Sequence, residues 1–411
     1  ETYGGSVFSD AGMKIPLEIE ELAVISRFLN SKVALHFLTA LSPTLNFEKG
    51  AIASLPLKRM EVNSFDEEFL ELAKTAKFDW DLHETSWDFL THPIFYKEHN
   101  NAPLNTAYKK IRNEWDSIVQ KTHQLEEKNN SIYINAYGLQ DDLEFQVPLN
   151  EITLTCNPYY RYPDSRRKKR SIKERETLLL EDTMQEFISY AVGCMLGRYS
   201  LDKPGLILAN AGETQEDYLR QVPEPSFMPD DDNVIPILAG EWFEDDIAER
   251  FKQFLKVTFG TEHYEENLAF IEEAIGKDIR AYFVKDFYNN HVKMYKKRPI
   301  YWQFSSAKGS FNALIYMHRY KPDTVSVILN GYLRQYREKL RAHKSMLEAR
   351  SISGGASQSE KTKALKEIEK LNKIQAELKE YEDEVLYPLA TRQIEIDLDD
   401  GVKVNYPRFG A

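Results

Sequence analysis

The chain has 411 residues, of which 42% are hydrophobic and 29% are charged, the balance of a soluble globular protein with two or three domains. A formal net charge of −12 excludes a surface that is basic all over, so a DNA-binding surface would have to be local. Cys156 and Cys194 are too few for a disulfide scaffold or a four-cysteine zinc site, and no apolar run approaches the roughly 18 to 20 residues of a membrane helix. We therefore expect a cytoplasmic protein.

The N-terminal third reads as mainly helical. The opening "ETYGGSVFSDAG" has no initiator Met and reads as strand and turn inside a domain, so we expect a fragment of a longer protein. Residues 17–41 place apolar side chains at helical spacing, and Pro43 ends that helix. A short strand or loop is expected over 46–57, followed by packing helices between 61 and 130.

The middle of the chain is more irregular. In residues 131–155 a helix ends at Gly138, and the residues at both ends of the stretch favour β structure. A buried helix is expected at about 177–197. Residues 202–240 are rich in Pro, Gly and Asp, which predicts an irregular excursion before further amphipathic helices.

The C-terminal part carries the clearest periodicity. Apolar residues alternate at three and four positions on both sides of "SISGGASQS", which predicts an antiparallel coiled-coil hairpin at about 323–387. The tail "RQIEIDLDDGVKVNYPRF" alternates around Asp-Gly and predicts a β-hairpin over 388–411. The predicted fold class is mixed, predominantly α with small β elements.

The stretch "CNPYYRY" resembles the Asn/Asp-Pro-Pro-Tyr/Phe turn with which enzymes that methylate the amine of adenine hold the flipped base. It lacks the second Pro, although it follows the β-prone "EITLT" as such a turn should. A site for S-adenosylmethionine needs a Gly-rich strand-to-helix turn, and no Gly-x-Gly occurs in the sequence. A structural turn is therefore favoured over a base-binding role, which stays open.

A basic run follows this turn. Residues 161–175 contain eight basic and two acidic residues, a marked contrast on an acidic protein. A flexible basic loop can clamp phosphates, and the alternative is a solvated loop before a helix. The residues that we predict to contact phosphates here are Arg166, Arg167, Lys168, Lys169 and Arg170.

A second basic region spans 285–321, where eight Lys and Arg residues accompany a single acid and many aromatic residues. Cations suit phosphates and aromatic faces suit bases, so this region is a candidate DNA surface. The alternative is a packed element with a charged rim. The predicted contacts are Lys296, Lys297 and Arg298, with Tyr301 and Trp302 as stacking or packing partners.

Other candidate sites are weaker. His83, His92 and His99 are loosely spaced and have no matching cysteines, so we predict no metal site there. The stretch "EIDLDDG" has its Gly one position late for a calcium loop and no closing acid. No Ser/His/Asp or Cys/His arrangement is recognisable, and we predict no catalytic residue in the chain.

Several long phrases carry a family resemblance. Residues 28–57, "FLNSKVALHFLTALSPTLNFEKGAIASLPL", resemble the end of the target-recognition domain of large adenine-specific DNA methyltransferases. The later phrases "YGLQDDLEFQVPLNEITLTCNPYYRY", "FISYAVGCMLGRYSLDKPGLI", "KRPIYWQF", "ALIYMHRY" and "IDLDDGVKVNY" are similar to the C-terminal half of the PglX methyltransferases of type 1 bacteriophage-exclusion (BREX) systems. The resemblance covers nearly the entire chain.

The resemblance implies that the whole protein transfers a methyl group from S-adenosylmethionine to N6 of adenine in a short, non-palindromic DNA site. This methylation would mark host DNA so that a phage-defence complex spares it. It places the catalytic and cofactor motifs upstream of this chain, so no cofactor is expected here. The implied partners are double-stranded DNA, the upstream methyltransferase domain and other defence-system proteins, without a membrane. Asn46 and Lys49, in the recognition-domain loop, are further candidates for the DNA face.

The predicted organisation has five segments: the end of a target-recognition domain (1–60), a helical connector (61–130), a C-terminal domain with the basic segments (131–322), the hairpin (323–387) and the tail (388–411). The main hypothesis is a non-catalytic portion that grips and helps read duplex DNA. The alternative is an interaction scaffold that docks other defence components through the hairpin. A third hypothesis is that the chain is a methyltransferase by itself.

Overall fold

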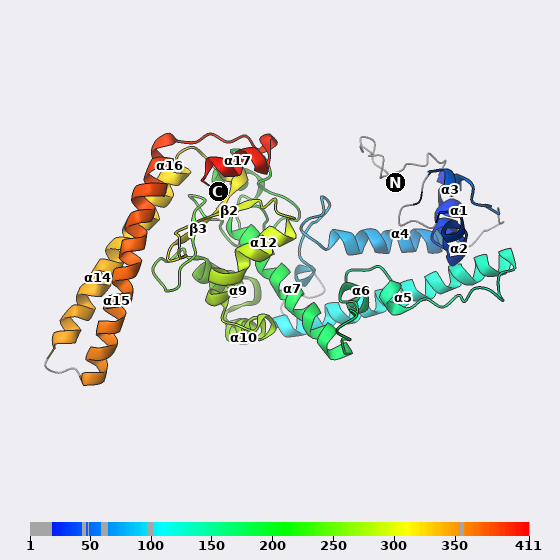
Figure 1. The fold of residues 1–411 in the computed structure, drawn as a ribbon, viewed down its shortest axis with the longest axis horizontal. Coiled ribbons are helices and arrows are strands. Elements are labelled where there is room, and N and C mark those ends of the chain that lie inside the picture. The colour runs from blue at the N-terminus through cyan, green and yellow to red at the C-terminus, as the bar shows by residue number, and fades with distance from the viewer. Residues whose placement is uncertain are drawn as a thin grey trace. The chain divides into compact units, whose positions relative to one another are not determined.

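The computed structural model describes residues 19–42, 47, 49–58, 65–96, 102–353 and 357–410. These residues form two compact units (Figure 1). The smaller unit contains the described parts of 1–81 and 111–179, and the larger unit contains those of 82–110 and 180–411. The units divide the chain differently from the five predicted segments, which remain a prediction.

The smaller unit is helical. Its core cluster consists of Phe28, Val33, Ala34, Tyr133 and Ile134. The second helix begins at Ser31, whose hydroxyl accepts a hydrogen bond from the backbone N–H of Ala34 and so caps the helix. The helices that lie in this unit or enter it are α1 (Ile19–Leu29), α2 (Lys32–Leu41), α3 (Lys49–Ala53), α4 (Phe65–Asp81), α5 (Leu104–Tyr137), α6 (Pro158–Arg161) and α7 (Ile172–Met195), with a 3-10 turn at Leu149–Glu151.

The larger unit surrounds a small antiparallel sheet of order β1-β3-β2, with β1 at Ile235–Pro236, β2 at Tyr301–Ser305 and β3 at Asn312–Tyr316. The central strand β3 is buried at every position, which shows that both faces of the sheet are covered there. The helices of this unit are α8 (Gln215–Gln221), α9 (Ile247–Phe259), α10 (Tyr264–Ile275), α11 (Ile279–Tyr282), α12 (Tyr288–Met294), α13 (Thr324–Val327), α14 (Arg334–Ile352), α15 (Gln358–Tyr381), α16 (Tyr387–Arg392) and α17 (Val402–Arg408). A mostly helical chain with small β elements was predicted, and the structure confirms this fold class.

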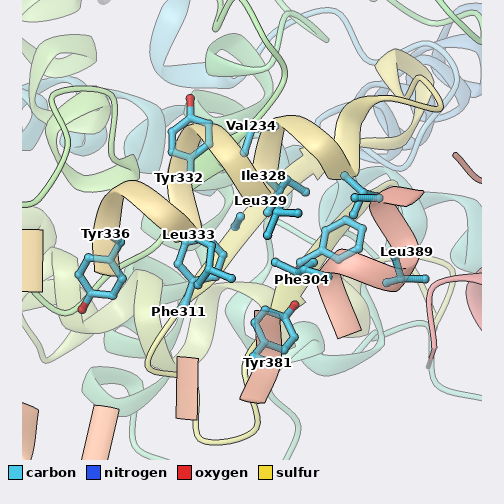
Figure 2. Close-up of a cluster of buried hydrophobic side chains, with 14 of the residues drawn as sticks. Val234, Phe304, Phe311, Ile328, Leu329, Tyr332, Leu333, Tyr336, Tyr381 and Leu389 are labelled. Carbon is cyan, nitrogen blue, oxygen red and sulfur yellow. The ribbon is translucent and has the colours of Figure 1, made fainter. Parts of the chain in front are cut away.

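The main hydrophobic cluster of the larger unit joins the sheet to the C-terminal helices (Figure 2). Phe304 from β2 and Phe311, just before β3, pack with Leu333 and Tyr336 from one helix and Tyr381 from another. Side chains of this size each contribute roughly 1.5–3 kcal/mol when fully buried, so the cluster fixes the sheet against both helices.

The predicted helical hairpin is present as two long helical segments. Helix α13 continues through a π-helical turn at Ile328–Leu333 into α14, and α15 continues through a second one at Glu382–Leu386 into α16. Helices α14 and α15 lie side by side and project from the rest of the unit (Figure 1). Arg334 and Arg337 both form ion pairs with Glu382, which joins the two segments at their base. The coiled-coil character of the hairpin remains a prediction.

The β-hairpin that was predicted for the tail is wrong. Residues Leu398–Asp400 form a 3-10 turn, and α17 follows it. Ile394 and Ile396, in the segment before this turn, and Leu398, at its first position, pack against the main cluster without a strand partner among the described residues. The period of two therefore reflects burial and not pairing. The strand or loop that was expected over 46–57 is also corrected, because Lys49–Ala53 is helical.

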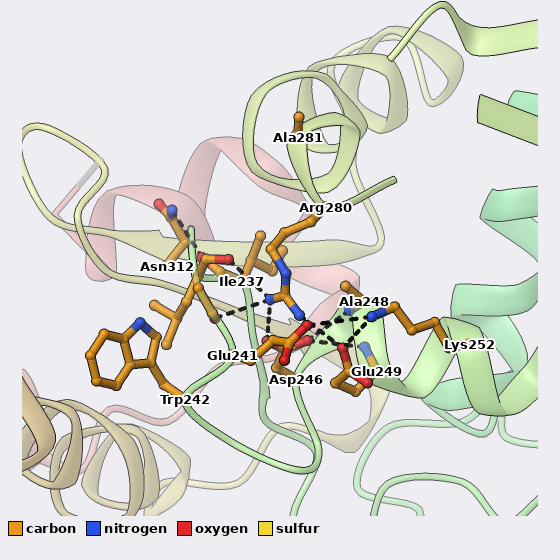
Figure 3. A network of polar contacts seen from close by, with 12 residues as sticks. Ile237, Glu241, Trp242, Asp246, Ala248, Glu249, Lys252, Arg280, Ala281 and Asn312 are labelled. Atoms are coloured by element: carbon orange, nitrogen blue, oxygen red, sulfur yellow. Dashed lines mark hydrogen bonds and ion pairs between the residues drawn. The ribbon is translucent and has the colours of Figure 1, made fainter. Parts of the chain in front are cut away.

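Arg280 organises a polar network in the larger unit (Figure 3). Its guanidinium pairs with Asp246, donates 3.1 Å to the carbonyl of Gly240 and 3.3 Å to that of Leu238, and donates 3.0 Å to Glu249. Asp246 in turn caps α9 by accepting hydrogen bonds from the N–H groups of Ala248 and Glu249 at 2.9 and 3.0 Å. Burial raises the pKa of Asp246 although Arg280 opposes the change.

No helix within the described residues is both long enough and apolar enough to cross a membrane.

We predict that Arg280→Ala lowers the free energy of unfolding by about 3–5 kcal/mol, because it leaves the fully buried carboxylate of Asp246 without its cation. Urea unfolding followed by circular dichroism measures the change. Arg220→Ala is the matched control, since Arg220 is 74% exposed and its pair with Asp217 is on the surface. Equal midpoints for the two variants would show that the network does not stabilise the fold.

Candidate nucleic-acid interface

The first predicted basic run forms a loop between α6 and α7 in the smaller unit. Arg166, Arg167, Lys168 and Lys169 are exposed on it. Asp164 closes its base by accepting hydrogen bonds from the backbone N–H of Arg170 at 2.9 Å and from the guanidinium of Arg175 at 2.6 Å. A tight turn follows, with the N–H of Ser165 bonded to the carbonyl of Lys168 at 2.9 Å. The loop is therefore held at its ends while its cations face solvent.

The acidic residues of the loop are already paired. The Arg170 N–H, with help from Arg175, lowers the pKa of Asp164, and the Ser171 N–H and hydroxyl lower the pKa of Glu174, so both acids stay ionised. Glu174 also lies 3.4 Å from the ammonium group of Lys168.

Three of the five predicted cations keep their charge available. Arg166, Arg167 and Lys169 form no hydrogen bond or ion pair through their side chains with any residue that the structure describes. Arg170 differs from them, because it is half-buried and its guanidinium donates to the carbonyl of Pro163 at 2.5 Å. The available positive charge of the loop thus lies on Arg166, Arg167 and Lys169.

The residues that shape this loop were not among the predicted ones. Ser171 and Glu174 form a capping box at the start of α7, with the Ser171 hydroxyl accepting from the Glu174 N–H at 3.2 Å and Glu174 accepting from the Ser171 N–H at 2.8 Å. The Ser-x-x-Glu spacing in "SIKE" carries that signal. Arg175 is a buried tether and not a surface cation, which no local pattern indicates.

Asn157 occupies a structural turn. Its side chain is fully buried, and its amide donates to the carbonyls of Leu149 and Ile152 at 2.7 and 2.9 Å. Its oxygen accepts from the N–H of Tyr159 at 3.0 Å, which caps α6, and Pro158 takes the first helical position. All of the hydrogen-bonding groups that could recognise a base are therefore engaged inside the protein.

These residues do not fit a methyl-transfer site. A flipped adenine at Asn157 would have to displace three hydrogen bonds and enter a position with no exposed surface. We derive no step of methyl transfer through this turn, and we assign no residue of the chain to S-adenosylmethionine.

The second predicted cluster forms the turn after α12 in the larger unit. Lys296, Lys297 and Arg298 are consecutive and exposed, and their side chains have no hydrogen bond or ion pair within the described parts of the chain. Lys296 and Lys297 have φ of 49° and 64°, the left-handed region that side chains other than Gly rarely adopt. The turn is held by the N–H of Lys297, which bonds to the carbonyl of Val292 at 2.8 Å. It presents three adjacent cations between α12 and β2.

Tyr301 has a packing role, which corrects its assignment as a DNA-binding residue. It is fully buried, and its ring stacks on that of His291 with centroids 4.5 Å apart. His291 Nε2 accepts the N–H groups of Ile300 and Tyr301, both at 3.2 Å. Trp302 is half-buried and packs on Tyr406 at 4.5 Å. Because its side chain has no exposed surface, the Tyr301 ring is inaccessible to DNA.

Of the two candidates in the recognition-domain loop, the structure describes one. Asn46 lies outside the described residues. Lys49 is exposed at the first position of α3. Their assignment to the DNA face remains a prediction.

Titratable groups elsewhere form internal contacts. His92 is buried and caps a short helix, and burial lowers its pKa to about 4, so it is neutral at physiological pH. Asp230, Asp231 and Asp232 bring carboxylate oxygens within 4.8 Å of one another, a grouping inside the predicted irregular excursion. Asp230 accepts from the N–H of Val234 at 3.1 Å, and Asp232 accepts from the Tyr332 hydroxyl at 3.0 Å. The first contact is local, and the second ties the excursion to the π-helical turn before α14.

Two curated proteins are similar to this chain over nearly all of it. The adenine-specific methyltransferase BrxX of Escherichia coli O9:H4 (strain HS) is 34% identical over 433 aligned residues, which cover 99% of this chain and 34% of that protein. The chain is homologous to a segment of the PglX and BrxX proteins. The adenine-specific methyltransferase PglX of Lacticaseibacillus casei (strain Zhang) is likewise 34% identical, over 399 residues that cover 93% of this chain and 31% of that protein.

These relatives confirm the predicted resemblance to PglX methyltransferases of BREX systems. The chain spans about a third of the length of the PglX and BrxX proteins that it matches. No family model matches it.

We predict that Asn157→Ala lowers the free energy of unfolding by about 1–3 kcal/mol, because it removes a helix cap and leaves two buried carbonyls without donors. Thermal unfolding measures the loss. Asn135→Ala is the control, since Asn135 is exposed on α5. A stable Asn157→Ala protein that has lost only methyl transfer would contradict the structural role.

Proposed function

We propose that this chain is a non-catalytic, DNA-binding part of a site-specific DNA N6-adenine methyltransferase in a bacterial phage-defence system. In this proposal the whole protein works in the cytoplasm and takes its methyl group from S-adenosylmethionine, which is bound by a part of the protein outside this chain. The names of the PglX and BrxX relatives support the reaction. The present chain binds duplex DNA and takes part in recognising the DNA site.

The observation that carries the proposal is the available charge of the 166–169 loop. Arg166, Arg167 and Lys169 are exposed and unpaired within the described chain, although acids outnumber bases by 12 in the protein as a whole. On a protein with this excess of acids, surface cations would normally be neutralised by nearby carboxylates. Here the two acids of the loop are bound to its own backbone and to Arg175 and Lys168, which leaves the three cations for external phosphates.

Phosphate contacts have a specific task in this reaction. A methyltransferase that acts on N6 must take the adenine out of the helix, and unstacking and unpairing the base cost a few kcal/mol. Contacts to the backbone on either side of the site hold the distorted duplex in register while the base is out. The turn of Lys296, Lys297 and Arg298 offers a second set of such contacts, and Lys49 and Asn46 are further candidates.

We predict that the triple substitution Arg166→Gln, Arg167→Gln and Lys169→Gln weakens DNA binding and reduces the slope of log K against log salt by up to about 2.7, since each lost phosphate contact removes about 0.9. Fluorescence anisotropy with a labelled duplex, over a series of salt concentrations, measures the slope for the full-length protein.

The control carries the same change in charge at another place. Lys361→Gln, Lys363→Gln and Lys366→Gln lie on α15 in the helical hairpin, and we expect the slope of the wild-type protein to be kept. An unchanged slope in the loop variant, or an equal decrease in both variants, would refute the assignment of the loop to phosphates.

A second candidate function is docking of other defence-system proteins by the helical hairpin. Its support is the exposure of large apolar side chains near the tip, with Met346 71%, Ile352 83% and Leu365 58% exposed. Isolated apolar side chains are common on surfaces, but three of them toward one end of a projecting hairpin favour a protein contact. This function and DNA binding use different elements and are compatible.

We predict that Ile352→Glu with Leu365→Glu reduces co-purification of the other defence proteins at least fivefold while DNA affinity is unchanged, because the charges oppose burial of the hairpin tip. Quantitative mass spectrometry after affinity purification from cells with the complete system measures this. Leu206→Glu with Val257→Glu alters exposed residues elsewhere and serves as the control. Full recovery of partners with the tip variant would exclude docking at this surface.

A further inference from the structure

The larger unit contains a cleft whose chemistry is opposite to that of the basic segments. It has a volume of about 380 Å³ and lies between β2, the end of α15 with its π-helical continuation, and the segment after α17. Its lining includes three glutamates and, among its described residues, no Lys, Arg or His. A phosphate backbone would be repelled from it, so DNA does not fit this cleft.

The floor and walls of the cleft are aromatic and preformed. Phe304, Tyr381 and Phe409 line it and are between 4% and 7% exposed. Phe409 is fixed by Phe304 at 5.4 Å and by Trp302 at 5.6 Å between ring centroids. Figure 2 shows Phe304 and Tyr381 as parts of the main cluster. An apolar or cationic side chain that enters would meet rings already held in position.

The carboxylates of the cleft are unequally engaged. Glu377 is satisfied from within, since it accepts from the hydroxyls of Ser306 and Ser310, both at 2.5 Å, and from the N–H of Lys308 at 2.7 Å. Glu380 and Glu384 are exposed, lie one helical turn apart, and have no ion pair or hydrogen bond among the described residues. Two unpaired carboxylates beside an aromatic wall form a site for a cation.

The strand beside the cleft adds an edge at which alternate backbone groups do not pair with β3, although one of those of Gln303 is hydrogen-bonded to Tyr288. Strand β2 is at the edge of the sheet, and no described strand pairs with its outer side. The bonds from the N–H of Ser306 to Phe311 and from the N–H of Met317 to Ile300 show that even-numbered residues pair with β3, so Gln303 and Ser305 turn their backbone groups outward. The side-chain oxygen of Gln303 is also buried without a hydrogen-bond donor. An extended segment that supplies donors fits this edge better than a compact ligand.

We propose that the cleft is a docking site for an extended segment of a partner protein, which places an arginine or lysine between Glu380 and Glu384 and an adjoining apolar side chain against Phe304 and Phe409. Charge complementarity selects the cation, because the lining offers carboxylates and no compensating base. The volume of about 380 Å³ accommodates a few side chains, consistent with a short linear motif. The lining contains none of the three exposed hairpin-tip residues and none of the exposed cations at 166–169 and 296–298.

The test uses the full chain and an acetylated, amidated pentapeptide of four valines around a central arginine. The same peptide with citrulline removes the charge and keeps the shape. Binding is followed by titration of the 15N-labelled protein, with the indole N–H of Trp302 as a reporter inside the cleft. We expect saturable binding of the arginine peptide and at least tenfold weaker binding of the citrulline peptide.

Glu380→Gln with Glu384→Gln should weaken binding of the arginine peptide at least tenfold, and these exposed positions tolerate the change without loss of fold. Glu265→Gln with Glu266→Gln on α10 makes the same change in charge elsewhere and should leave binding intact. Absence of arginine-peptide binding, or equal binding by both double variants, would overturn the proposal. Self-association of the chain that disappears in the Glu380/Glu384 variant would identify a second copy as the occupant and overturn it also.

Discussion

The ion pair between Arg280 and Asp246 determines how the larger unit is assembled. It connects the start of α11 with two segments that lie 34 to 42 residues earlier in the sequence. These are the chain after β1, through the carbonyls of Leu238 and Gly240, and the start of α9, through Asp246. From α11 the chain runs without a break through a π-helical turn into α12, then into the basic turn and β2. The position of the Lys296–Arg298 turn and the edge of β2 therefore both depend on a buried contact more than fifteen residues away.

Some acidic side chains of the protein are satisfied by hydrogen bonds and ion pairs within the fold, and this leaves other charged side chains exposed. In the basic loop, Asp164 and Glu174 are bound to backbone N–H groups and to neighbouring cations, which leaves the outer cations unpaired. In the acidic cleft the reverse holds, since Glu377 is satisfied by the β2–β3 turn while Glu380 and Glu384 remain available. An acidic chain can thus expose cations at one place and carboxylates at another, according to which of its own groups are already satisfied.

The aromatic residues show where sequence reasoning reaches its limit. The 12% aromatic content and its mixture with cations near residue 300 are compatible with stacking on bases and with a packed core. The structure buries Tyr301 against His291, and nearby Arg198 donates to the hydroxyls of Tyr199 and Tyr316 at 3.0 and 3.1 Å. Which face of a strand is covered depends on segments far away in the chain, so no local pattern distinguishes a stacking ring from a core ring.

The sequence alone determined the mostly helical fold class, the hairpin of two long helices, the family resemblance and the location of both basic segments. These features are local: helical periodicity, a Gly/Ser connection and runs of like charge can be read from adjacent residues. Only the tertiary structure decided that Arg175 is buried and bonded to Asp164, and that the side chain of Asn157 is hydrogen-bonded within a turn. It also decided that the alternating tail packs without a strand partner among the described residues, and that an acidic cleft lies beside β2. Each of these outcomes depends on partners distant in the chain, because burial and hydrogen-bond satisfaction are properties of the assembled fold and not of a segment.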